Sequence, residues 1–217
     1  MRPTLILASG SPRRRELLSS LGLPFTVCPP SVDETLRPEH PAEQEAVRLA
    51  TEKAREAALR QDGVVVAADT LVAMGDEIFE KPKGPEEARA MLQRLRGREH
   101  RVVTGVVVAN RASLWAGQRV TQVLMRSYTD AEIAEYIARG EPFDKAGGYA
   151  IQDRGFHPVE RITPGLSGVR ACPPDGRGCY CNVVGLPLGL LLALLRDAGY
   201  SIGELTQPPQ CAGCPDW

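Results

Sequence analysis

The sequence predicts an α/β fold. Short apolar runs that suit buried strands alternate with segments in which apolar residues recur at helical spacing. The chain has 217 residues, 43% of them hydrophobic, which is enough for one sizeable core. No internal repeat or linker divides it. We therefore expect one domain over residues 1–200, followed by a cysteine-containing tail over residues 201–217.

The first strand and helix are predicted from their boundaries. Leu5–Ala8 is a short apolar run typical of a buried strand. Ser11 suits the N-cap of the helix that follows, with Pro12 in its first position and Gly22 just past its end.

A second helix is expected from about Ala42 to Leu59. Its predicted apolar face consists of Val47, Ala50, Ala54, Ala57 and Ala58. The next segment, GVVVAADT, predicts a buried strand that ends on the carboxylate of Asp69.

The second half of the chain continues the alternation of strands and helices. The expected elements are a hairpin at Gly75-Asp76, a helix over Pro85–Arg96, strands over Arg101–Ala109 and Val120–Tyr128, a helix opened by a Thr129/Glu132 capping box and closed by Gly140, and a final helix over Pro187–Asp197.

The charge of the chain is balanced. It carries 26 basic and 27 acidic residues, so no overall field attracts nucleic acid or an anionic membrane. The apolar run Leu5–Ala8 is too short for a signal peptide, and Val183–Leu195 is too short and too interrupted by glycine and proline for a membrane span. We expect a cytoplasmic protein with neither nucleic acid nor membrane as a partner.

A local anion site is nevertheless indicated at the start of the first helix. The backbone N–H groups after Ser11 have no partners within the helix, and Arg13 and Arg14 stand beside them. Cations at a helix N-terminus are mildly unfavourable and need compensation. From these residues alone, a phosphate site and a solvated basic turn remain equal alternatives.

Several other charged residues are candidates for chemistry. Asp69 and Glu34, the latter in SVDET, suit a metal ligand or a general base, and each equally suits a carboxylate that caps a turn. Lys53, Lys81 and Lys145 are ordinary exposed lysines unless the fold brings them together.

Several motifs in order are similar to those of one family. LASGSPRRREL, VDET, EKA, AADT, EKPKG, TGVVV, DKAGGYAIQ and NVVGLPL follow one another between about Leu5 and Leu195. This order resembles the Maf family of nucleoside triphosphate pyrophosphatases. The resemblance implies a mixed-sheet, two-lobed α/β domain like that of inosine triphosphate pyrophosphatases, with a nucleotide cleft between the lobes and usually a homodimer. It also implies hydrolysis of a nucleoside triphosphate between its α and β phosphates, with Mg²⁺ or Mn²⁺ as cofactor.

The resemblance also implies roles for particular residues. Substrate binding falls to Ser9, Arg13, Arg14, Thr70, Lys145 and Gln152, and catalysis to Glu34, Lys53, Asp69 and Lys81. Glu34 and Asp69 are the implied metal ligands, and Asp69 matches the proton acceptor. The trio Arg13, Thr70 and Gln152 resembles the branch acting on dTTP and UTP. The alternative function is a nucleotide-binding regulator of cell division with little or no turnover.

The chain departs from the family pattern in its last quarter. A Gly-, Pro- and Cys-rich insert occupies about residues 164–178, and the tail adds the pair Cys211 and Cys214. Cysteines of the tail and the insert region suit a structural zinc site, with buried cysteines and a loose tail as the simpler alternatives. The candidate zinc ligands are Cys172, Cys179, Cys181, Cys211 and Cys214.

Overall fold

A mixed seven-stranded sheet organises the protein. The computed structural model describes residues 3–165 and 178–211. The strand order is β2-β1-β3-β5-β6-β7, with β4 paired to β3. Strand β1 is parallel to both β2 and β3, and the remaining pairs are antiparallel. The strands are β1 (Leu5–Ala8), β2 (Phe25–Val27), β3 (Val64–Met74), β4 (Glu77–Phe79), β5 (Glu99–Ala109), β6 (Leu114–Met125) and β7 (Val159–Pro164).

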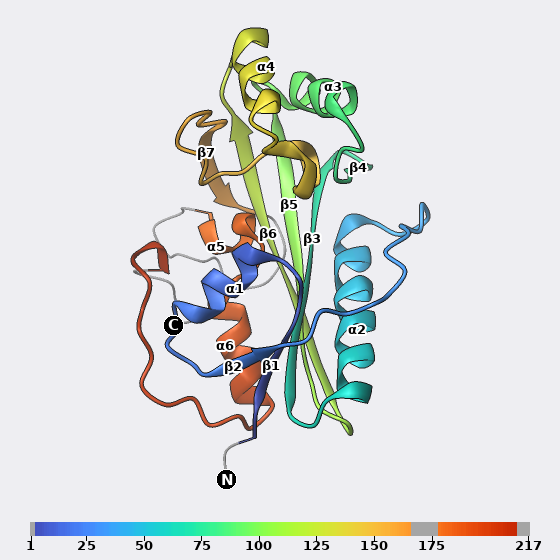
Figure 1. The fold of residues 1–217 in the computed structure, drawn as a ribbon, viewed down its shortest axis with the longest axis vertical. Coiled ribbons are helices and arrows are strands. Elements are labelled where there is room, and N and C mark those ends of the chain that lie inside the picture. The colour runs from blue at the N-terminus through green and yellow to red at the C-terminus, as the bar shows by residue number, and fades with distance from the viewer. Residues whose placement is uncertain (1–2, 166–177, 212–217) are drawn as a thin grey trace.

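Helices cover both faces of the sheet (Figure 1). In Figure 1, α2 lies on one side of the long strands, and α1, α5 and α6 lie on the other, while α3 and α4 stand at the far end. The helices are α1 (Pro12–Ser19), α2 (Ala42–Arg60), α3 (Pro85–Leu95), α4 (Asp130–Ala138), α5 (Tyr180–Val184) and α6 (Leu188–Asp197), with short 3-10 turns η1 (Pro142–Asp144), η2 (Ala146–Gly148) and η3 (Pro209–Cys211). Among the described residues, none of the helices is both long enough and apolar enough to cross a bilayer.

The first strand separates two cores. Its side chains alternate, so Leu5 and Leu7 join the leucine-rich core formed with α6, whereas Ile6 and Ala8 join the alanine-rich core under α2. A third core lies at the far end of the long strands, and it includes Phe79, Ala88, Leu92, Tyr128, Ile133 and Phe156. The protein thus has two lobes that share β3, β5 and β6, which confirms the predicted two-lobed, mixed-sheet α/β fold.

The local sequence signals for two helix starts and one hairpin turn predict the structure correctly. The Ser11 hydroxyl accepts a hydrogen bond from the Arg14 backbone N–H at 3.5 Å, as an N-cap should. Thr129 and Glu132 form both bonds of the expected capping box at the start of α4. Gly75, at the β3–β4 hairpin, has a positive φ of 63°, a conformation that glycine adopts without strain.

Three predictions were wrong in detail. The strand expected over Val120–Tyr128 runs instead from Leu114 to Met125. Strand β3 does not end at Asp69 but continues to Met74. Instead, its parallel partner β1 ends near this point, and the β1–β3 pairing stops at Ala8 and Ala67. Asp69 therefore lies in mid-strand, just past the carboxyl end of β1. On α2, Val47 is only partly buried, because Ala46 and Leu49 turn toward the sheet instead.

Strands β2 and β7, helix α5 and the 3-10 turns were not predicted. Strand β2 has three residues and α5 has five, too few to establish a periodic pattern.

Helix α2 makes an unusually close approach to the sheet at Gly105 of β5. A Cβ atom at this position would lie 2.4 Å from the Ala46 carbonyl oxygen, so only glycine fits under the helix. Gly105 is also the direct cross-strand partner of Asp69. The glycine thus sets the height of α2 above the strand that carries Asp69.

Candidate active site

A cleft of about 540 Å³ brings the predicted site residues together. Its walls come from both lobes, with the turn after β1, α1, α2 and the loop after β2 on one side and the segments around η1 and η2 on the other. Every residue predicted for catalysis or substrate binding lines it: Ser9, Arg13, Arg14, Glu34, Lys53, Asp69, Thr70, Lys81, Lys145 and Gln152.

The base of the cleft is a buried lysine between two carboxylates. Lys53 projects from the alanine-rich face of α2 and is 5% exposed. Its Nζ lies 2.5 Å from Asp69 Oδ1 and 2.9 Å from Glu34 Oε1. Partial burial by itself would raise the pKa of Glu34, but the hydrogen bond and charge of Lys53, with Lys81 and Arg14, lower it overall. Glu34 is therefore ionised at neutral pH.

Arg14 is held in place by two residues that are far from it in the sequence, Thr70 and Gly185. Its Nε donates to the Gly185 carbonyl at 2.8 Å, and its Nη2 donates to Thr70 Oγ1 at 3.0 Å. Thr70 Oγ1 in turn lies 3.0 Å from Thr104 Oγ1. Burial lowers the pKa of Arg14, with the charge of Asp69 opposing this effect, yet an arginine remains protonated in proteins. The side chain is a fixed cation at one wall of the cleft.

Ser9 joins the same wall. It is 5% exposed, and its Oγ accepts a hydrogen bond from the Ser11 backbone N–H at 3.2 Å and lies 3.5 Å from Arg14 Nη1. By contrast, Arg15 is exposed.

Asp144 joins the two sides of the cleft, and the sequence had not singled it out. Its Oδ2 lies 2.6 Å from Arg13 Nη1, and its Oδ1 lies 2.6 Å from Lys145 Nζ. Burial raises its pKa, but the hydrogen bonds from Lys145 and Arg13 more than offset this and lower the pKa overall. The available signal was its position beside Lys145 in DKAGG. The Asp144 carboxylate thus forms ion pairs with both Arg13 and Lys145, two cations that face the cleft.

The lysines differ in burial. Lys53 and Lys145 are buried, against the surface preference of lysine, whereas Lys81 is exposed on the cleft wall. Gln152 is also an exposed wall residue. The fold therefore brings the predicted lysines together, which periodicity could not indicate.

Glu34 and Asp69 can supply some of the ligands of a magnesium or manganese ion, but two carboxylates alone do not complete its coordination. Mg²⁺ in phosphate-transfer sites is commonly held by one or two carboxylates together with substrate phosphates. Two carboxylates that share one ammonium partner match such a donor set. Among the described residues, there is no group of three or more His, Cys, Asp or Glu side chains arranged to hold a metal by itself.

The predicted zinc site finds no support in the described residues. Cys172 and Cys214 lie outside them, and Cys179, Cys181 and Cys211 belong to no such metal-binding group. Instead, Cys181 of α5 and Cys211 are buried with their Sγ atoms 3.2 Å apart. This contact packs the end of the described chain against α5.

The fold and the cleft together define a class of protein: a two-lobed α/β protein whose cleft gathers cationic side chains around two carboxylates. Residues 4–173 match the family model described as Maf-like protein. The chain belongs to this family, as its motifs predicted.

Known relatives agree with this assignment, and one solved structure shares the fold. The chain is 50% identical to a dTTP/UTP pyrophosphatase of Thermomicrobium roseum, covering 98% of this chain and 93% of that one. It is 44% identical to a dTTP/UTP pyrophosphatase of Anaeromyxobacter dehalogenans, covering 93% of this chain and 97% of that one. The solved structure of the Staphylococcus aureus Ham1 protein shares the fold, with a TM-score of 0.51 at 12% identity over 90% of this chain and 99% of that one.

Proposed function

We propose that this protein hydrolyses nucleoside triphosphates, with dTTP and UTP as substrates, to the nucleoside monophosphate and pyrophosphate. The observation that carries the proposal is the convergence of cations from both lobes on a cleft with two carboxylates at its base. Relatives named dTTP/UTP pyrophosphatase that align over nearly the whole chain support the choice of reaction and substrate.

The cations suit the charge of the substrate. A nucleoside triphosphate carries about four negative charges, and negative charge builds on the departing pyrophosphate during cleavage. Arg13, Arg14, Lys81 and Lys145 line the cleft that would receive it. We assign them to binding the phosphates and to stabilising the leaving group.

Asp69 is the proposed proton acceptor. Lys53 donates to its Oδ1, which fixes the orientation of the carboxylate. We assign Oδ2, the oxygen not bonded to Lys53, to receive the proton of the water that attacks the α-phosphorus. No covalent intermediate is required.

Glu34 and Asp69 are the proposed ligands for Mg²⁺ or Mn²⁺. When bound, the ion neutralises phosphate charge and lowers the pKa of bound water.

Gln152, Arg13 and Thr70 are proposed to govern the choice of base. The Gln152 amide has a donor and an acceptor, which suits the O4 and N3–H edge of thymine or uracil. Thr70 acts indirectly here, since its hydroxyl accepts a bond from Arg14.

The test is a panel of nucleoside triphosphates incubated with the protein and Mg²⁺ or Mn²⁺, with pyrophosphate and orthophosphate measured separately. We expect pyrophosphate from dTTP and UTP, and its loss on chelation of the metal. Orthophosphate alone would reject cleavage between the α and β phosphates. Absence of release from every nucleotide would favour a regulator of cell division that binds nucleotide without turnover.

We also propose a homodimer, to be measured by light scattering of the purified chain. We further propose one domain over residues 1–200, followed by a cysteine-containing tail over residues 201–217. Of the described part of this tail, residues 201–211, Cys211 is buried in the leucine-rich core of the domain.

A further inference from the structure

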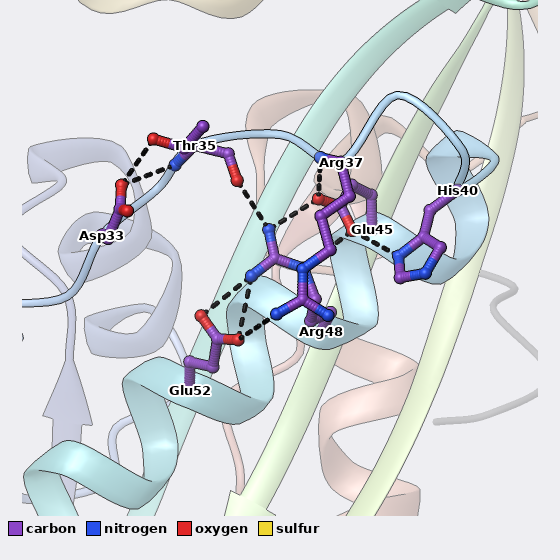
Figure 2. Close-up of polar contacts among 7 residues, drawn as sticks. All are labelled: Asp33, Thr35, Arg37, His40, Glu45, Arg48 and Glu52. Atoms are coloured by element: carbon purple, nitrogen blue, oxygen red, sulfur yellow. Dashed lines mark hydrogen bonds and ion pairs between the residues drawn. The ribbon is translucent and has the colours of Figure 1, made fainter.

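A second charged cluster lies on α2, on the side of the loop that leads into the helix (Figure 2). Its centre is Glu45, a carboxylate that is 0% exposed. Arg48 binds both of its oxygens, with Nε 2.7 Å from Oε2 and Nη2 2.5 Å from Oε1. Arg48 also bonds to Glu52, with Nη1 2.8 Å from Oε1. None of the three residues lines the cleft.

Both members of the Glu45–Arg48 pair hold the loop that precedes α2. Arg48 Nη2 donates to the Thr35 carbonyl at 2.9 Å. Glu45 Oε1 accepts from the Arg37 backbone N–H at 2.7 Å, and Glu45 Oε2 lies 3.0 Å from His40 Nδ1. Figure 2 shows these contacts spanning the loop from Thr35 to His40. The loop has no helix or strand from Cys28 to Pro41, so these bonds replace regular secondary structure.

The residue that this arrangement fixes is Glu34. On its two sides, Asp33 Oδ1 accepts from the Thr35 backbone N–H at 2.9 Å and from the Thr35 hydroxyl at 2.6 Å. Glu34 therefore lies in a turn that the Asp33–Thr35 hydrogen bonds close, and the Thr35 carbonyl at the end of this turn is bonded to Arg48. Its own side chain is half exposed and reaches Lys53 Nζ at 2.9 Å.

We propose that Arg48, oriented by Glu45, positions Glu34 for the metal ion and the triphosphate. This inference rests on the proposed function and names positioning residues for it. A buried ion pair contributes little to stability compared with apolar packing, but it fixes one arrangement when each partner has several bonds to satisfy. The fork of a guanidinium is needed, because Arg48 must reach Glu45, Glu52 and the Thr35 carbonyl at once.

The central test compares Arg48→Lys with Arg55→Lys. Lysine keeps the charge but cannot make all of these bonds, whereas Arg55 is an exposed residue of the same helix. For Arg48→Lys, we expect kcat for dTTP to fall about tenfold, and the Mn²⁺ concentration that gives half-maximal activity to rise about tenfold. For Arg55→Lys, both should change less than twofold. Unaltered kinetics in Arg48→Lys with only a lower melting temperature would show a purely structural role.

A double-mutant cycle then asks whether Arg48 acts through Glu34. In a Glu34→Ala background, Arg48→Lys should lower kcat less than twofold further, because the group it positions is gone. A full tenfold loss in that background would overturn the proposal.

Two readouts do not require turnover. Mn²⁺ binding in the presence of α,β-methylene-UTP, measured by electron paramagnetic resonance, should weaken about tenfold in Arg48→Lys. Hydrogen exchange of the amides of residues 35–37 should accelerate at least tenfold. If the wild-type protein binds Mn²⁺ but hydrolyses no nucleotide, and Arg48→Lys still weakens this binding about tenfold, the proposed function fails and the positioning proposal stands. If Mn²⁺ binding is the same in both proteins, the positioning proposal fails whatever the activity.

Discussion

Lys53 and Asp69 form a buried ion pair, with Nζ 2.5 Å from Oδ1 and both side chains less than a tenth exposed. Removing one partner of such a pair leaves the other charge uncompensated, which destabilises a protein strongly. Here Glu34 is a second partner for the lysine at 2.9 Å. The site can therefore lose one carboxylate charge without leaving Lys53 unpaired.

Asp69→Asn is expected to remove activity while the fold remains. The amide has the same shape as the carboxylate but cannot accept a proton, so kcat should fall about 10²- to 10⁴-fold. Pyrophosphate release and thermal unfolding measure the two effects separately. Asp62→Asn is the matched control, because Asp62 is exposed and pairs only with Arg111 among its described salt bridges. Wild-type rates in Asp69→Asn would refute the assigned role.

Asp144→Asn is expected to lower KM for dTTP, by about two- to fivefold at low salt. Asp144 pairs with both Arg13 and Lys145, so the triphosphate has to compete with it for these two cations. Loss of the Asp144 charge removes this competition, and it also removes the repulsion between the carboxylate and the phosphates of the substrate. Steady-state kinetics at two ionic strengths check this, and the effect should shrink at high salt. An increase in KM would mean that Asp144 instead holds the cations in their binding positions.

Gly185→Ala is expected to impair both stability and activity. Gly185 has a positive φ of 124°, and an added Cβ would lie 3.3 Å from Thr70 Oγ1 and 3.6 Å from Arg14 Nε. The strain costs on the order of 1 kcal/mol, and displacement of Arg14 should lower kcat/KM. Gly199→Ala is the control: its φ is also positive, at 69°, but nothing lies within 4 Å of the added Cβ. That variant should lose stability and keep its activity, and equal activity losses in the two would contradict the role given to Gly185.

Stability in acid should depend on Glu45. Hydrogen bonds, first of all from Arg48, lower the pKa of Glu45 from 4.5 to about 2. Because the folded-state pKa is the lower one, this contribution is complete above pH 4.5 and is lost as the pH falls toward 2. It amounts to on the order of 3 kcal/mol. Urea unfolding at pH 7 and pH 3 should give a smaller pH dependence for Glu45→Gln than for the wild type, and identical dependences would contradict this account.

The sequence predicted those features that depend on neighbouring residues. The Ser11 cap, the Thr129/Glu132 box and the glycine turns are set within a few positions, so local patterns reveal them. The extension of β3 past Asp69 was missed, because AADT looks like a strand end while β5 supplies its partner from far along the chain.

The site was predicted through its family motifs, not through periodicity. On sequence alone, Lys53 and Lys145 look like surface residues, and only the fold buries them. Glu45, Arg48 and Glu52 likewise have the spacing of an ordinary solvated helix face. Their link to Thr35 is a contact with a loop that has no regular structure, and no local pattern predicts such a contact.

Gly105 gives the active site a dependence on a residue that bears no functional group. A larger side chain would push against Ala46 and lift α2, and with it Lys53, away from the strand on which Asp69 stands. In a saturation-mutagenesis screen scored by activity, position 105 should therefore rank with the charged residues of the cleft. Positions sensitive to substitution would then include a packing contact between a helix and a strand as well as the residues proposed for catalysis.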